Sequence, residues 1–434
     1  MKEAAQRIFR ETLAAIDIPS TLARTLDRNG SRVRVGQATI NLHDFTSIVG
    51  IAFGKASFAM ADGLTQILLP DFSAEGILVT PAAPPRELPG WKSFVGGHPL
   101  PTAASFAAGA AILDRLQRCD ARTLVFFLVS GGGSAMVEQP LDAAVALEDF
   151  QALNKVLVTC GAPIEEINVI RKHLSAIKGG RLAVAAGEAT KITFGVSDVP
   201  EGHESALASG PTIPDPTTVD EAHRLADRYG LLAKVPPSIR AIFERGALRE
   251  TPKDGDAEFA RAHFHLLLRS HDLTHAAHRA CECVGCMCLC DESTDGWPLE
   301  KAADHLLGVL DAMRGVNPRK RVALIADGEV SSPVTGDGVG GRNSAFVLTC
   351  VPKIAGKKIC VLSAGTDGID GNSVAAGAVA DGDTMSRARA AGMNAANFLR
   401  RSDAFTFFDR LGDAVVSGPT GNNLRDLRIL FAEV

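Results

Sequence analysis

Apolar runs alternate with amphipathic stretches through the first half of the chain. The apolar runs are continuous, as is typical of parallel strands that are covered on both faces, and they lie at residues 47–53, 76–80, 124–129 and 192–196. The stretches around them have helical periodicity, at residues 56–67, 102–117, 147–160 and 164–186. This alternation predicts a mostly parallel sheet with helices on both faces.

A second α/β unit is predicted after residues 234–255, a segment rich in proline, glycine and charge that is the expected linker. Its strands are expected at residues 264–268, 286–290, 321–326, 358–363 and 427–431. The predicted fold class is α/β, with two three-layer α/β/α domains on mostly parallel (mixed) sheets. We expect a Rossmann-like domain over residues 1–245, which begins with a charged amphipathic helix, and a C-terminal α/β domain over residues 246–434.

Composition and charge exclude several classes of protein. A chain of 434 residues favours two domains over one. The net charge of −5 argues against a protein that binds nucleic acid. Every apolar run is far shorter than the ~20 residues of a membrane helix. Because the N-terminus does not resemble a signal peptide, we expect a cytoplasmic protein with no nucleic-acid or membrane partner.

Five of the nine cysteines lie between residues 281 and 290. Cys283 and Cys286 form a C-x-x-C pair, which is compatible with a metal site. The surrounding pattern instead predicts a helix end, a turn at Gly285 and a strand over residues 286–290. Sulfurs on one strand face lie ~7 Å apart, too far for three of them to chelate one zinc ion. We therefore expect buried, reduced thiols.

Two glycine-rich runs follow predicted strands. The first consists of Ser130, Gly131, Gly132, Gly133 and Ser134. The second has four glycines, at 336, 338, 340 and 341, and ends in Arg342 and Asn343. Glycine lets a backbone take positive φ or approach a neighbour closely. Because a helical pattern starts at Arg342, we expect a guanidinium and open backbone N–H groups at a helix N-terminus, an arrangement that binds anions.

Candidate catalytic and binding residues lie at the predicted carboxyl ends of strands, where open α/β sheets bind ligands. Besides the glycine runs, these ends carry Gly54-Lys55, Ser197-Asp198, Gly328-Glu329 and Thr366-Asp367. Cations with rows of N–H groups bind phosphate, and acids bind its metal or accept a proton. These are the components of phosphoryl transfer.

Each component has a simpler interpretation. Lys55 is compatible with a surface lysine, and Asp198 and Asp367 with turn residues or helix caps. A basic stripe follows the predicted helix near residue 171, and it is either a solvated face or a surface that steers an anionic substrate. Its members are Arg171, Lys172, His173, Lys178 and Arg181.

Standard nucleotide motifs do not fit the chain. Gly336, Gly338 and Gly341 form a G-x-G-x-x-G, but nine residues separate it from the preceding strand, whereas the dinucleotide fingerprint follows its strand at once. The sequence also lacks G-x-x-x-x-G-K-[ST], which excludes a P-loop kinase. The glycine runs therefore indicate an unusual kinase.

In combination, these runs resemble the class II glycerate 2-kinases, a family whose members are often labelled hydroxypyruvate reductases. The shared runs in the first half are GKAS from Gly54, GHPLP from Gly97, SGGGSA from Ser130, GAPIEEINVIRKHLSAIKGGRLA from Gly161, SDVPEG from Ser197 and ASGPTIPDPTT from Ala208. Those in the second half are GE from Gly328, GDGVGGRN from Gly336, GTDGIDG from Gly365 and SGPTGNN from Ser417.

The resemblance implies a two-domain α/β enzyme with its active site in an interdomain cleft. It implies phosphorylation of D-glycerate at the 2-hydroxyl, dependent on ATP and Mg²⁺. The family's essential lysine falls on Lys55 and its essential arginine on Arg342, while Asp198 matches an acid that orients or deprotonates the hydroxyl. We take Asp198 as a candidate Mg²⁺ ligand as well, and expect a monomer or homodimer.

The remaining candidates are residues expected to bind substrate or nucleotide. They are Gly54, Ser130, Gly131, Gly132, Gly133, Ser134, Lys172, Lys178, Glu329, Gly340, Gly341, Asn343, Thr366 and Asp367.

The chain departs from the family pattern at three acidic positions. Glu201-Gly202-His203 stands where the family usually has Gly-Asp-Asp, Ser344-Ala345 where it has Gln-Glu, and Thr102 where Pro-Asp is usual. Two alternatives therefore stay open. One is an NAD(P)-dependent hydroxypyruvate reductase, and the other is a ligand-binding homologue with altered catalysis.

Overall fold

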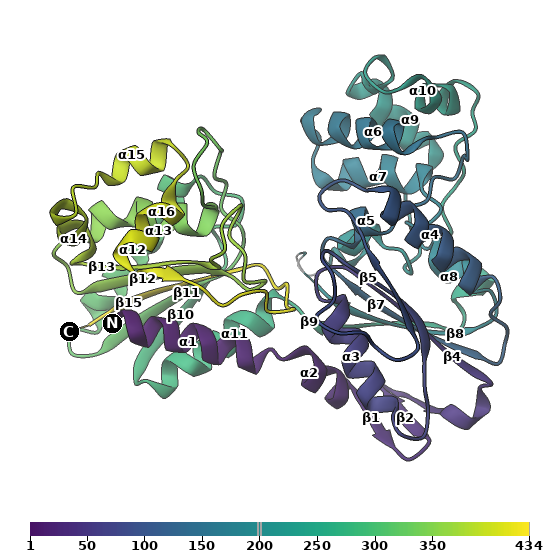
Figure 1. Ribbon diagram of the computed structural model, residues 1–434, viewed down its shortest axis with the longest axis horizontal. Coiled ribbons are helices and arrows are strands. Elements are labelled where there is room, and N and C mark those ends of the chain that lie inside the picture. The colour runs from purple at the N-terminus through teal and green to yellow at the C-terminus, as the bar shows by residue number, and fades with distance from the viewer. Residues whose placement is uncertain (198, 200–201, 434) are drawn as a thin grey trace. The chain divides into compact units, whose positions relative to one another are not determined.

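The computed structural model describes residues 1–197, 199 and 202–433 (Figure 1). The chain divides into two compact units. One consists of Ile18–Leu267, and the other combines Met1–Asp17 with Leu268–Val434. The division thus falls at residue 267 rather than 245, and the N-terminal helix belongs with the C-terminal half.

The unit of residues 18–267 is built on a six-stranded sheet. Its strands are β4 (Ser47–Phe53), β5 (Glu75–Thr80), β6 (Trp91–Val95), β7 (Thr123–Ser130), β8 (Thr190–Val196) and β9 (Ala262–Leu268). They lie in the order β6-β5-β4-β7-β8-β9, and the ladders from β6 to β8 are parallel. The strand expected at 264–268 therefore completes this first sheet rather than beginning a second one.

Helices cover both faces of this sheet (Figure 1). The helices of this unit are α2 (Ile18–Thr25), α3 (Ser57–Leu68), α4 (Ala103–Leu116), α5 (Gly133–Met136), α6 (Leu147–Thr159), α7 (Ile164–Leu174), α8 (Arg181–Ala185), α9 (Val219–Arg228) and α10 (Pro237–Glu244). Of these, α6, α7, α9 and α10 form a separate cluster rather than a layer on the sheet. The core under α4 and α8 includes Phe53, Phe127 and Ile112. A small antiparallel sheet, which the hydrophobic pattern did not indicate, contains β1 (Leu26–Asn29), β2 (Arg32–Val35) and β3 (Ala38–Asn41).

Two predictions for this unit are wrong. The segment 164–186 is not one helix, because α7 ends at Leu174 and α8 begins only at Arg181, after Gly179 and Gly180 with positive φ. Residues 234–255 are not a linker either, since α10 lies inside that segment. Its Ile239 and Phe243 are buried in a second apolar cluster with α6, α7 and α9.

The other unit contains a six-stranded mixed sheet. Its strands are β10 (Cys286–Asp291), β11 (Arg321–Ala326), β12 (Ile359–Gly365), β13 (Gly377–Asp381), β14 (Ala414–Val415) and β15 (Asp426–Ala432). Their order is β10-β11-β15-β12-β13-β14, and β15 is antiparallel to both of its neighbours. This central antiparallel strand, predicted from its apolar run, brings residues near the C-terminus to the middle of the sheet.

Two layers of helices enclose the mixed sheet (Figure 1). One layer is α1 (Lys2–Ala15) and α11 (Ser270–Cys283), and the other is α12 (Leu299–Val316), α13 (Arg342–Ile354), α14 (Thr384–Ala390), α15 (Ala395–Arg400) and α16 (Ala404–Leu411). Phe346 of α13 is fully buried in the core of the second layer. The predicted α/β architecture with flanking helices is therefore confirmed.

The cysteine-rich segment folds as the pattern predicts. Helix α11 ends at Cys283, Gly285 turns with a φ of 78°, and β10 begins at Cys286. All nine cysteines are free thiols. Cys281 and Cys286 are buried, but Cys283 and Cys290 are exposed, so the expectation of uniformly buried thiols is wrong.

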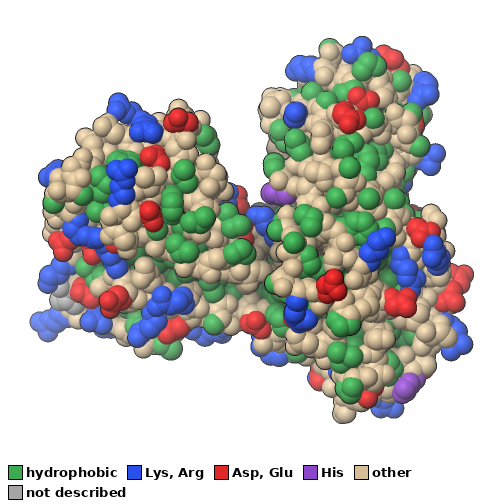
Figure 2. Space-filling view, in the orientation of Figure 1, with side chains coloured by type: hydrophobic (Ala, Val, Ile, Leu, Met, Phe, Trp, Pro, Cys, Tyr) green, Lys and Arg blue, Asp and Glu red, His purple; other side chains and the backbone are tan. Residues whose placement is uncertain are grey.

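The surface carries both signs of charge. Figure 2 shows acidic and basic side chains interspersed over the visible face of each unit. Among the described residues, no helix is long and apolar enough to cross a membrane.

Candidate functional site

Lys55 lies in a tight turn between β4 and α3. Gly54 opens the turn with a φ of 114°, which strongly favours glycine. The Lys55 N–H donates to the carbonyl of Gly131 at 2.9 Å, and the Ala56 N–H donates to Ser130 Oγ at 2.9 Å. The structure therefore brings the GKAS and SGGGSA runs together, with the half-buried Lys55 where they meet.

The SGGGSA loop is shaped by packing against its own unit. Gly132 has a φ of 81° and precedes the single turn of α5. A Cβ on Gly133 would press on Phe53 and Ala208. Ser134 Oγ lies 2.9 Å from Ser209 Oγ, in the run ASGPT. Ser209 is thus a site neighbour that the sequence analysis did not single out.

The expected catalytic acid, Asp198, lies outside the described residues. Ser197, which precedes it, is buried just beyond β8, and its Oγ donates to the carbonyl of Val199 at 3.2 Å. Both the proton-accepting role of Asp198 and its role as a Mg²⁺ ligand stay predictions.

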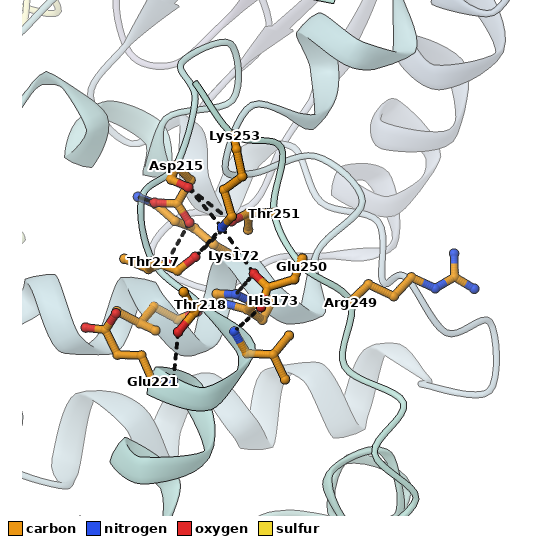
Figure 3. A network of polar contacts seen from close by, with 12 residues as sticks. Lys172, His173, Asp215, Thr217, Thr218, Glu221, Arg249, Glu250, Thr251 and Lys253 are labelled. Atoms are coloured by element: carbon orange, nitrogen blue, oxygen red, sulfur yellow. Dashed lines mark hydrogen bonds and ion pairs between the residues drawn. The ribbon is translucent and has the colours of Figure 1, made fainter. Parts of the chain in front are cut away.

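Lys172 is buried in a polar network rather than on a solvated face (Figure 3). Its Nζ donates to Asp215 Oδ1 at 2.9 Å, and Thr217 Oγ1 donates to the other carboxylate oxygen at 2.6 Å. Burial raises the pKa of Asp215, but Lys172 and Thr217 outweigh this and hold that pKa below its usual value. The charge of Lys172 is therefore already balanced within the unit.

Lys178 also forms a buried ion pair. Its ammonium group donates to the carboxylate of Glu138, and both side chains are 1% exposed. Burial lowers the pKa of Lys178, and the charge of Glu138 opposes that shift. Like Lys172, Lys178 has its partner inside the unit, which favours a structural role for both.

His173 completes the interior part of this stripe. Its Nδ1 lies 2.8 Å from the carbonyl of Val169, while its Nε2 is buried 3.9 Å from a carboxylate oxygen of Glu250 (Figure 3). Burial lowers the pKa of His173, so the neutral imidazole is favoured. The interpretation of this stripe as a solvated basic face is wrong.

Arg342, the first residue of α13, is held by two carboxylates. Its Nε lies 2.5 Å from Asp426 Oδ2 and its Nη2 lies 3.2 Å from Asp426 Oδ1, while Nη2 also lies 2.8 Å from Glu329 Oε1. Burial lowers the pKa of Arg342, but hydrogen bonding and charge from Asp426 outweigh it and raise the pKa above its ordinary value. Arg342 and Glu329, two expected site residues, are therefore direct partners.

The N-terminus of α13 is capped by the protein itself. Asp370, which is almost fully buried, accepts the N–H groups of Asn343 and Ser344, each at 2.9 Å. A Cβ on Gly341 would clash with Asp370, so this glycine permits a close approach. The expectation of open N–H groups at this helix start is wrong for Asn343 and Ser344, because a carboxylate of the same chain already binds them.

The glycine loop before α13 is bonded internally as well. The N–H of Val339 donates to Asp403 Oδ1 at 3.0 Å and that of Gly340 donates to Asn372 Oδ1 at 2.8 Å. The prediction that these glycines serve a close approach is confirmed by Gly338, whose Cβ would overlap Asp403. The approached group is the protein's own backbone and side chains.

The loop after β12 is a structural junction. Thr366 is fully buried, its Oγ1 donates to the carbonyl of Arg425 at 2.8 Å, and it accepts the N–H of Leu424 at 2.8 Å. Asp367 is half-buried and accepts the N–H of Ile369 at 3.0 Å, as a turn residue does. Thr366 thus fixes the segment that leads into β15 and its Asp426.

Two family models match the chain. The domain of unknown function DUF4147 matches residues 4–244, and the MOFRL family matches residues 322–426. A glycerate 2-kinase of Pyrococcus horikoshii is 32% identical over 99% of this chain and 97% of its own length. A D-glycerate 2-kinase of Thermotoga maritima is 30% identical over 91% and 93% of the two chains.

A relative from Agrobacterium vitis carries the provisional name hydroxypyruvate reductase, at 36% identity over 88% of this chain and 86% of its own. Among solved structures, that of a glycerate kinase from Thermotoga maritima superposes with a TM-score of 0.85 and 28% identity, over 100% and 99% of the two chains. The chain therefore belongs to the glycerate 2-kinase family, in which DUF4147 and MOFRL regions follow one another.

Proposed function

We propose that this chain is a glycerate 2-kinase that phosphorylates D-glycerate at its 2-hydroxyl, with ATP as the donor. The relatives that match almost the full chain support the activity. The observation that carries the assignment to this chain is Arg342, a charged guanidinium held by Asp426 and Glu329 at the start of α13. Such a group neutralises charge on a transferring phosphoryl group.

The proposed mechanism uses two cations. Lys55 and Arg342 contact oxygens of the γ-phosphoryl group and stabilise the negative charge that develops during transfer. Asp198 accepts the proton of the 2-hydroxyl, and the hydroxyl oxygen then forms the bond to phosphorus while ADP leaves. Lys172 and Lys178 maintain the fold of their unit through Asp215 and Glu138 and do not touch substrate.

The residues present are compatible with ATP and Mg²⁺. ATP supplies the phosphoryl group, and Mg²⁺ neutralises part of its charge. Among the described residues, no group of three or more potential ligands is arranged to hold a metal ion. Mg²⁺ that arrives with ATP keeps its phosphate and water ligands and needs only one or two carboxylates, a requirement that the half-buried Glu329 and Asp198 fit by their chemistry.

A reductase that uses NAD(P) is disfavoured by the glycine loop. A dinucleotide site needs the N–H groups of such a loop for pyrophosphate, whereas those of Val339 and Gly340 are bonded to Asp403 and Asn372. We keep the expectation of a cytoplasmic monomer or homodimer as part of this proposal.

The test is a coupled assay with purified protein, D-glycerate, ATP, Mg²⁺ and enolase, which consumes only 2-phosphoglycerate. Product formation without added phosphoglycerate mutase would support both the kinase activity and its position on glycerate. NADH-dependent consumption of hydroxypyruvate, with no kinase signal, would overturn the proposal. If neither assay shows activity but ATP and glycerate raise the melting temperature, the protein is a ligand-binding homologue.

The roles of the two cations are tested in the same assay. Lys55→Ala and Arg342→Ala should each reduce kcat by orders of magnitude without unfolding the protein. Lys155→Ala and Arg389→Ala are matched controls, because both side chains are exposed on helices, α6 and α14. Near-normal turnover in either Lys55→Ala or Arg342→Ala would remove that residue from the mechanism.

A further inference from the structure

Asp426 fixes Arg342 through two atoms at once. It accepts both Nε and Nη2 of the guanidinium, so the planes of the two groups are constrained together. The Asp426 side chain is 3% exposed, while that of Arg342 is 38% exposed. The carboxylate is thus an interior anchor, and the guanidinium is the part of the pair that reaches solvent.

The direction of the guanidinium follows from which nitrogens are occupied. Asp426 and Glu329 take Nε and Nη2, and among the residues that the structure describes Nη1 has no partner. A planar group fixed along one edge can rotate very little. The edge that carries Nη1 is therefore the one that Arg342 offers to a ligand.

Arg428 supports the two carboxylates that hold Arg342. It lies two residues after Asp426 in β15, on the same face of the strand. Arg428 is fully buried, and it donates to the carbonyls of Asp327 and Gly328, each at 2.8 Å. These two residues immediately precede Glu329. One strand thus positions both carboxylates that hold Arg342.

We propose that Asp426 is a positioning residue for phosphoryl transfer, which holds Arg342 so that Nη1 meets a phosphoryl oxygen. The inference rests on the proposed kinase function and adds to it a residue that acts only through Arg342. Because Asp426 is buried under the guanidinium, it does not itself touch substrate.

The first test compares Asp426→Asn, Arg342→Ala and the double variant by kcat and KM. Asn keeps the size but loses the charge and one acceptor, so kcat should fall ~10²-fold, as misplacement of a catalytic group does, with little change in the KM for D-glycerate. The double variant should be no slower than Arg342→Ala alone, because Asp426 then has nothing left to position. Additive losses would overturn the inference.

The second test is chemical rescue with guanidinium chloride at millimolar concentration. Guanidinium should restore part of the activity of Arg342→Ala, since Asp426 and Glu329 still form its site. It should restore none in Arg342→Ala/Asp426→Asn, and equal rescue in both would contradict the proposal. Asp426→Glu, which keeps the charge but shifts it by one methylene, gives the same prediction of reduced kcat if Asp426→Asn does not fold.

Wild-type activity distinguishes a failure of the proposed function from a failure of the positioning role alone. If the wild-type protein does not phosphorylate glycerate, the proposed function fails. If it does, only the positioning role fails when the kcat losses of Asp426→Asn and Arg342→Ala are additive, or when guanidinium rescues Arg342→Ala equally well with and without Asp426→Asn. Thermal unfolding of each variant shows whether a loss of activity reflects loss of fold.

Discussion

Replacing Lys178 tests whether the cations of the first unit serve substrate or fold. Its ammonium group and the Glu138 carboxylate form an ion pair with both side chains 1% exposed. Glu138 also accepts Ser175 Oγ at 2.5 Å and the N–H of Gln139 at 2.9 Å, so it stays in place when the lysine is removed. Lys178→Met therefore leaves a carboxylate in the interior without its counter-charge.

The expected loss of stability is large. Removing one partner of a buried ion pair costs about 3–5 kcal/mol, because the remaining charge is uncompensated. In a unit of this size each kcal/mol lowers the melting temperature by roughly 2–4 °C, so we expect a decrease of about 6–20 °C. Lys178→Met/Glu138→Gln should recover most of it, since no charge is then left unpaired.

The assay combines thermal unfolding with steady-state kinetics well below the transition. Lys178→Met should melt earlier, yet its kcat and its KM for D-glycerate should stay near the wild-type values at low temperature. The exposed Lys155→Met, on α6, is the control and should change stability by less than about 0.5 kcal/mol. An unchanged melting temperature together with a raised KM would refute the structural role and restore Lys178 as a substrate ligand.

Three further changes probe the glycine turn, the helix cap and the thiols. Gly54→Ala forces a Cβ against the Ser130 carbonyl at a φ of 114°, and should cost about 1–3 kcal/mol and reduce kcat; wild-type melting and turnover would contradict this. Asp370→Asn removes one acceptor from the start of α13, and urea unfolding should show a loss of about 1–3 kcal/mol, whereas an unchanged midpoint would argue against the cap. Iodoacetamide should label exposed Cys283 before Cys360, whose pKa burial raises to about 12, and peptide mass spectrometry showing the reverse order would contradict the burial.

Local pattern was sufficient to predict most elements of the two sheets. The run at 124–129 lies within β7, whose residues are all buried, and the run at 47–53 is β4. The direction of a strand and its place in the sheet were harder to predict. The apolar run of β15 indicates a strand, but it does not indicate that this strand lies antiparallel between β11 and β12. The short strands β1 to β3 are only four residues each, too short for a clear period-2 signal.

The residues that complete the candidate site come from distant parts of the chain. Asp370 caps a helix that starts 28 positions earlier, and Asp426 anchors Arg342 across 84 positions. Neither acid has a sequence signature beyond a turn or a strand end. The same distance in sequence hid the burial of Lys172 and Lys178. A run of cations predicts a solvated face, and the buried partners Asp215 and Glu138 lie elsewhere in the chain.

The glycine run before α13 uses its backbone N–H groups for its own architecture, and this bears on how phosphate is bound. The N–H groups of Val339 and Gly340 bond to Asp403 and Asn372, and those of Asn343 and Ser344 bond to Asp370. A P-loop binds phosphate mainly with such N–H groups. Because these donors are occupied, we expect the proposed kinase to bind phosphate at this helix start through the Arg342 side chain. Losing Arg342 should therefore weaken turnover far more than it would in an enzyme whose main chain shares the task.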